Sequence, residues 1–129
     1  MNPADLFDHE TEPVLLKEGE ALFHEGDEAH GMYVLLDGNV VVLVGDVPVE
    51  NATRGALLGE MALVDSRPRT ATVMAISPCR LATIDERRFH FMVQHTPNFA
   101  SHVMRVLVQR LRQMNSLTRT TISINHPDD

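Results

Sequence analysis

The chain has 129 residues with 18 acidic and 11 basic side chains, a formal net charge of −7 and one cysteine. This length suits a single domain over residues 1–129, and 43% hydrophobic with 22% charged residues is typical of a globular rather than a disordered protein. The acidic balance argues against whole-surface attraction to nucleic acid or anionic membranes. Cys79 has no second cysteine to pair with, and the sequence shows neither a signal-peptide pattern nor a membrane-spanning apolar run. We therefore expect a cytoplasmic protein.

We expect a helical segment over residues 1–12 and a β-barrel over residues 13–84. The second region consists of short runs rich in Val, Leu and Thr that Gly and Asp separate, which predicts an antiparallel barrel or jelly roll. Asp37-Gly38 lies between two of these runs and predicts a hairpin, since glycine readily adopts the positive φ of such a turn. The expected strands are VLLK (14–17), ALFH (21–24), MYVLL (32–36), NVVVLV (39–44), ATVMAI (71–76) and CRLATI (79–84).

After Ile84 the pattern changes to that of helices, which we expect over residues 85–119. Asp85 is placed to cap a helix with the sequence ERRFHFMVQH, because its carboxylate can accept the unpaired amides of the first turn. Thr96-Pro97 ends this helix and starts the next, since proline is favoured at the first helical position. The last helix is predicted from about Asn98 to Thr118, followed by a frayed tail over residues 120–129.

The last predicted helix carries apolar residues on more than one face. A stripe recurs at alternating steps of four and three residues, and three valines widen it. Two interpretations stay open: the helix packs only on its own barrel, or it also contacts a second copy of the chain. The stripe is Ala100, Met104, Leu107, Leu111, Met114 and Thr118, and the valines are Val103, Val106 and Val108.

Residues 55–73, GALLGEMALVDSRPRTATV, do not fit a plain strand. After Gly59, the residues EMAL predict one turn of helix whose free amides favour an anion. Arg69 follows Pro68, and an arginine fork beside free amides is a common way to hold phosphate oxygens. Glu60 has the same sign as a phosphate but can accept a hydrogen bond from a ribose hydroxyl. Together these residues predict a site for a phosphate joined to a sugar.

The ordered string Gly59-Glu60-Met61-Ala62-Leu63 and Pro68-Arg69-Thr70-Ala71-Thr72-Val73 resembles the phosphate-binding cassette of the cyclic nucleotide-binding domain family. The cassette would span residues 58–73. The resemblance implies a β-jelly roll with a short cassette helix and C-terminal helices, and cAMP or cGMP as ligand without a metal. It extends over nearly the whole chain through Gly19, Phe23, Glu25-Gly26-Asp27, Tyr33, Gly38, Phe89, Pro97 and Arg110-Leu111.

The resemblance also implies a role for each matching residue. Glu60 would accept the ribose 2′-hydroxyl, and Arg69 would pair with the exocyclic phosphate oxygens. Thr70 would bond the phosphate or the amino group of a guanine. The last helix would act as a lid that brings Arg110 to Glu60. The remaining expected contacts are Leu58 and Met61 along the sugar and base, the amides around Met61 and Ala62 near the phosphate, Gly59 where the backbone approaches closely, Ala71 in the wall, and Met114 and Asn115 over the base.

We therefore expect a stand-alone regulatory module, not an enzyme, that binds a cyclic nucleotide and prefers cAMP to cGMP. No helix-turn-helix, kinase or channel segment follows Thr118 in this sequence, so the module would act without binding DNA or inserting into a membrane. It would act through a separate protein effector, as a homodimer through the last helix, or as a nucleotide buffer.

Three other interpretations of the sequence fit these residues less well. A degenerate interaction module would keep the fold and lose the ligand, but the cassette glutamate and arginine are both present. A metal-dependent cupin needs a His-x-His pair, which the sequence lacks. A hydrolase needs a nucleophile elbow, and neither Ser66 nor Ser77 lies in one.

Overall fold

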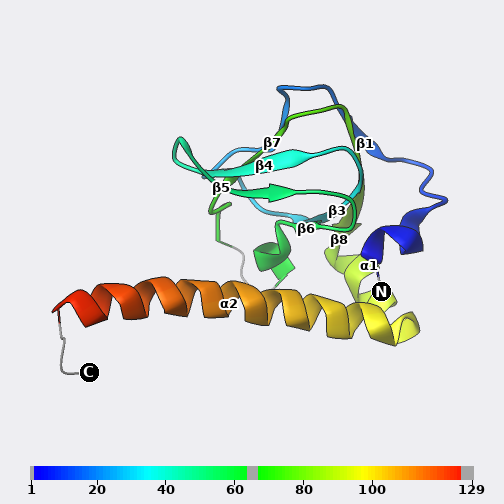
Figure 1. Ribbon diagram of the computed structural model, residues 1–129. Helices are drawn as coiled ribbons and strands as arrows, with labels where there is room; N and C mark the ends of the chain where they lie inside the picture. The colour runs from blue at the N-terminus through cyan, green and yellow to red at the C-terminus, as the bar shows by residue number, and fades with distance from the viewer. Residues whose placement is uncertain (1, 64–66, 126–129) are drawn as a thin grey trace.

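The computed structural model describes residues 2–63 and 67–125. Eight strands form the barrel, with 3-10 helices before the first strand and within the cassette, and two α-helices follow (Figure 1). In chain order the elements are η1 (Pro3–Phe7), β1 (Val14–Leu16), β2 (Ala21–Phe23), β3 (Gly31–Asp37), β4 (Val40–Val44), β5 (Val47–Ala52), β6 (Leu57–Leu58), η2 (Glu60–Leu63), β7 (Thr72–Ala75), β8 (Cys79–Asp85), α1 (Glu86–His95) and α2 (Pro97–Asn125).

The strands form two four-stranded antiparallel sheets with the orders β1-β8-β3-β6 and β2-β7-β4-β5. This is the predicted jelly roll with helices. Alternate side chains of a strand face opposite sides, and in β3 both sets are buried, each in a different cluster. Leu35 packs inside the barrel with Val40 and Leu81. Met32 and its neighbours on the other face pack with Phe99 of α2. The barrel interior and the layer of helices therefore share β3 as a common wall.

The predicted hairpin at Asp37-Gly38 is wrong. β3 and β4 belong to different sheets, so the turn carries the chain from one sheet to the other. Gly38 does have the predicted positive φ of +93°, and a Cβ there would collide with Pro78 and Cys79. The turn thus packs against the return crossing from β7 to β8. A glycine that predicts positive φ is therefore compatible both with a hairpin turn and with a turn that connects two sheets.

The hairpin lies one turn later, at Gly45, where β4 pairs with β5 through Val44 and Val47. We did not predict β5, whose sequence VPVENA contains Pro48. Proline is tolerated there because β5 is at the edge of its sheet. A register shift between Val42 and Leu43 adds a residue to β5, which is a β-bulge.

Both predicted helix starts are confirmed. Asp85 caps α1, its carboxylate accepting the Arg88 amide at 2.8 Å, and α2 begins at Pro97 directly after Thr96. α2 runs past the predicted end at Thr118 as far as Asn125, into the stretch expected to be a frayed tail. Along the part of the chain that the structure describes, no helix is both long and apolar enough to cross a bilayer.

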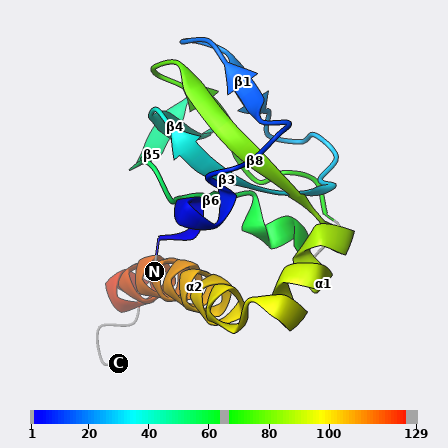
Figure 2. The ribbon, with the colours of Figure 1, turned by 90° about the vertical axis from the view of Figure 1, so that its right-hand side faces the viewer.

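α2 crosses beneath the barrel (Figures 1 and 2). The helix has two apolar faces. The face toward β3 and α1 carries Phe99 and Val103, with Val106 and Leu107 packed against them. The outer face exposes Met104, Val108 and Leu111. The sequence stripe mixes the two faces, because Leu107 lies on the core side and Met104 does not. The described residues give the outer face no partner within the chain.

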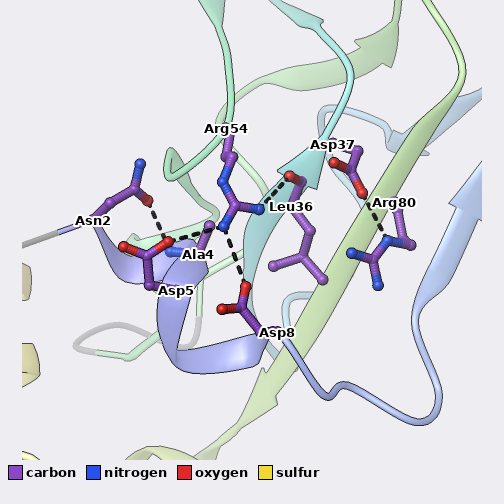
Figure 3. A network of polar contacts seen from close by, with 8 residues as sticks. All are labelled: Asn2, Ala4, Asp5, Asp8, Leu36, Asp37, Arg54 and Arg80. Atoms are coloured by element: carbon purple, nitrogen blue, oxygen red, sulfur yellow. Dashed lines mark hydrogen bonds and ion pairs between the residues drawn. The ribbon is translucent and has the colours of Figure 1, made fainter.

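The N-terminal segment is tied to the barrel by Arg54 (Figure 3). Its guanidinium donates to the Leu36 carbonyl at 2.9 Å and pairs with Asp5 at 2.9 Å and Asp8 at 3.3 Å. The side chain of Asn2 caps η1 by accepting the Ala4 amide at 2.9 Å. Of the expected helical segment 1–12, the described residues 2–12 contain one short 3-10 helix, η1.

Candidate functional site

β6 ends at Leu58, the first residue of the cassette, and Gly59 follows it. Gly59 has a φ of +75°, a region that side chains other than glycine rarely adopt. A Cβ at Gly59 would also collide with the guanidinium of Arg69. The one-turn helix predicted after it is present as η2, in which the Ala62 amide donates to the Gly59 carbonyl at 3.1 Å. Glycine is thus required at this position both by the backbone and by the packing of Arg69.

Arg69 is buried, with only 8% of its surface exposed. Its Nη1 donates to the Gly59 carbonyl at 3.2 Å and its Nη2 to the Gly31 carbonyl at 2.8 Å. The guanidinium carbon stacks on the Phe23 ring, 4.2 Å from its centroid, which is a cation–π contact. The backbone of Arg69 is also fixed, because its amide donates to the Asp27 carbonyl at 2.8 Å.

The charge of Arg69 has no carboxylate within salt-bridge distance among the described residues. Its Nε is buried and has no hydrogen-bond partner there. Burial lowers the pKa of the guanidinium, and the nearby Tyr33, Asp27 and Glu60 oppose that shift through their charge. A buried donor left unpaired is costly, so Arg69 is a cation arranged for an anionic partner.

Glu60 is the second buried charged residue of the site, with 5% of its surface exposed. Its Oε1 lies 3.2 Å from Nε of Arg110 on α2, which confirms the proximity of Arg110 and Glu60 predicted from the sequence. The Nη1 of the same arginine forms a close ion pair with Glu50 on β5. Sequence reasoning missed Glu50, because only the pairing of β5 brings it to this place.

A cavity of about 410 Å³ opens between the cassette, the β4–β5 hairpin and α2. It brings together nine of the predicted site residues: Leu58, Gly59, Glu60, Met61, Ala62, Arg69, Thr70, Ala71 and Arg110. The side chains of the other two, Met114 and Asn115, lie outside the described part of the chain. The cavity adds residues that the sequence did not single out as ligand contacts: Phe23, Val42, Val44, Val49 and Gln113.

The wall of the cavity combines apolar side chains with a buried cation and a buried carboxylate. That combination suits a small ligand that has an apolar body, one anionic group and a hydroxyl. The described residues contain no cluster of three or more His, Cys, Asp or Glu side chains able to hold a metal ion. The charged and apolar residues of the wall are able to recognise a ligand by charge, hydrogen bonds and apolar contact.

Comparison with known proteins places the fold in a family. Residues 13–96 match the family model described as the cyclic nucleotide-binding domain. The matched segment contains every described strand, the cassette and all of α1. The chain therefore belongs to the cyclic nucleotide-binding domain family.

Individual relatives agree with this assignment. A cAMP-dependent protein kinase regulatory subunit of Hypocrea atroviridis is 35% identical over 71 residues, which are 55% of this chain and 15% of that protein. A cAMP-activated global transcriptional regulator of Pasteurella multocida is 32% identical over 106 residues, 74% of this chain and 51% of the relative. The chain thus spans between about a sixth and a half of the length of these two relatives.

Among solved structures, an EAL enzyme in its cAMP-bound form aligns with a TM-score of 0.60 and 29% identity. The alignment covers 88% of this chain and 32% of that one. The same enzyme has also been solved in a cGMP-bound form, which aligns with a TM-score of 0.61 and 29% identity over 88% of this chain and 32% of that one.

Proposed function

We propose that this chain is a non-catalytic regulatory module that binds a cyclic nucleotide, cAMP in preference to cGMP. The observation that carries the proposal is Arg69, a buried guanidinium with an unpaired Nε at the wall of an apolar cavity. The exocyclic oxygens of a cyclic phosphate would supply the missing anionic partner. Relatives with cAMP in their names, and an EAL enzyme solved with either nucleotide, support this ligand class.

The proposed ligand contacts follow from the charges on the cavity wall. Arg69 pairs with the phosphate, and Glu60 accepts the ribose 2′-hydroxyl, since an ionised carboxylate offers only acceptors. The Ala62 amide already donates within η2, so the guanidinium carries most of the phosphate recognition. Leu58 lines the sugar, Met61 lines sugar and base, and Thr70 contacts the phosphate or a guanine amino group.

The proposed lid is the part of α2 that begins at Arg110. This residue already reaches Glu60 in the structure, and Met114 and Asn115 follow one turn later, where we propose that they cover the base. A closed lid favours binding only as far as the ligand prefers the closed state. The module would pass this change to a separate effector, or to a second copy through the outer apolar face of α2.

Titration calorimetry with cAMP, cGMP and 5′-AMP tests the proposed function directly. We expect saturable binding of cAMP, weaker binding of cGMP, and much weaker binding of 5′-AMP, whose phosphate is not cyclic and carries an additional charge at neutral pH. The absence of heat with both cyclic nucleotides, repeated at a second temperature, would overturn the proposal and favour a ligand-free interaction module.

Truncation after Gln109 tests the lid. This variant keeps Phe99, Val103, Val106 and Leu107, the α2 residues of the core, and removes Arg110 with everything after it. We expect the affinity for cAMP to fall about tenfold, through faster dissociation, because Glu60 loses its cationic partner and the base loses its cover. Stopped-flow release of a fluorescent cAMP analogue measures the rate, and the full chain is the control. Equal dissociation rates for the two forms would contradict the lid.

A further inference from the structure

The bulge in β5 places a carboxylate on the cavity side of the barrel. Val42 pairs with Glu50 across the two strands, and directly paired residues face the same side of a sheet. Val42 and Val44 on that side line the cavity. Glu50 therefore occupies a half-buried position on an otherwise apolar face, where a carboxylate requires a partner.

The partner of Glu50 is Arg110, which divides its guanidinium between two carboxylates. Nη1 pairs with Glu50 and Nε lies 3.2 Å from Oε1 of Glu60. Because the guanidinium is planar and rigid, fixing one nitrogen fixes the direction of the others. The ion pair with Glu50 thus fixes the orientation of the Arg110 guanidinium that contacts Glu60.

Packing alone does not hold Arg110 in this orientation. Its side chain remains 31% exposed and lines both the large cavity and a second cavity of about 180 Å³ between α2 and the β5–β6 segment. With open space on two sides, its position depends on the ion pairs. Glu60 itself, whose side chain is only 6% exposed, depends on Arg110 for its charge partner.

We propose that Glu50 is a positioning residue for ribose recognition. Through Arg110 it holds the Glu60 carboxylate in the orientation that accepts the 2′-hydroxyl. Glu50 does not touch the nucleotide and acts only through the arginine. The inference rests on the proposed function and extends it by adding a residue of the β4–β5 hairpin to the recognition of the sugar.

The test compares cAMP with 2′-deoxy-cAMP, which lacks the hydroxyl in question, by calorimetry on the full chain. Glu50→Gln keeps the shape of the side chain and removes its charge. We expect its affinity for cAMP to fall about three- to tenfold and its affinity for 2′-deoxy-cAMP to stay at the wild-type value. Asp46→Asn is the matched control, since it removes the same charge from an exposed position at the tip of the same hairpin and should change neither affinity.

A double-mutant cycle distinguishes an action of Glu50 through Arg110 from a general structural role of Glu50. In an Arg110→Gln background, Glu50→Gln should cause no further loss of cAMP affinity, because the pathway to Glu60 is already broken. Glu50→Asp, which keeps the charge but shortens the side chain, is the second variant if Glu50→Gln folds poorly. It should show the same selectivity for the hydroxyl to a smaller degree.

The outcomes separate this inference from the proposed function. If the wild-type chain binds neither nucleotide, the proposed function fails and this inference fails with it. If the wild-type chain binds, but Glu50→Gln weakens both nucleotides equally or weakens neither, the role of Glu50 is overturned while nucleotide binding stands.

Discussion

Arg69→Met should lose at least about tenfold in affinity for cAMP while the protein stays folded. The lost charge-assisted bonds to the phosphate are each worth about 1.5–3 kcal/mol, and the cyclic phosphate would then enter an apolar pocket without a cation. Calorimetry with cAMP measures the loss. Arg69→Lys should recover only part of the affinity, because an ammonium keeps the charge but not the planar fork.

The stability of Arg69→Met distinguishes a ligand-binding arginine from a structural one. The variant leaves the carbonyls of Gly59 and Gly31 without their donor, but it also removes a buried cation that no carboxylate neutralises. These effects oppose each other, so we expect the free energy of unfolding to change by about 1 kcal/mol or less.

The matched control for Arg69 is Arg80→Met. Arg80 pairs with Asp37 at 2.8 Å (Figure 3) and is absent from the residues that line the cavity. This variant should leave the affinity for cAMP unchanged. A dissociation constant for Arg69→Met equal to that of the control would assign Arg69 to the structure of the barrel alone.

Gly59→Ala should damage both stability and ligand binding. Alanine at a φ of +75° costs about 1–2 kcal/mol of backbone strain. In addition, its Cβ would occupy the place of the Arg69 guanidinium, so the arginine would have to move away from the phosphate position. We expect a lower free energy of unfolding in urea and a loss of about tenfold or more in affinity for cAMP.

Gly19→Ala separates these two effects. Gly19 has a φ of +91°, and a Cβ there would meet nothing within 4 Å. The variant should therefore lose stability to a degree similar to that of Gly59→Ala but bind cAMP with wild-type affinity. If both variants keep the wild-type affinity, the contact between Gly59 and Arg69 has no part in ligand binding.

Local signals in the sequence predicted much of this fold. The cap at Asp85 and the boundary at Thr96 were correct because each depends on the few residues around it. The hairpin at Asp37-Gly38 was wrong because a positive-φ glycine reports a turn but not the strands that the turn joins. The strand containing Pro48 was missed because proline weakens the strand pattern, and only the sheet order shows that the strand is at an edge.

The sequence predicted the cassette residues of the candidate site, but not the residues that other strands contribute to it. The order of Gly59, Glu60 and Arg69 along the chain carried the prediction, and the three residues do line one cavity. Glu50 could not be found in this way, because a one-residue bulge decides which face it occupies. That information belongs to the pairing of two strands and not to either strand alone.

The start of β3 links the proposed phosphate contact to the helical layer through adjoining residues. The Gly31 carbonyl accepts Nη2 of Arg69, and the next residue, Met32, is packed in the cluster that contains Phe99 of α2. A side chain at position 31 would disturb this connection, since a Cβ there would collide with the Ile84 carbonyl. If the proposed cyclic phosphate binds Arg69, the hydrogen bond to Gly31 connects it to a residue next to the packing of α2, by contacts that do not include the lid.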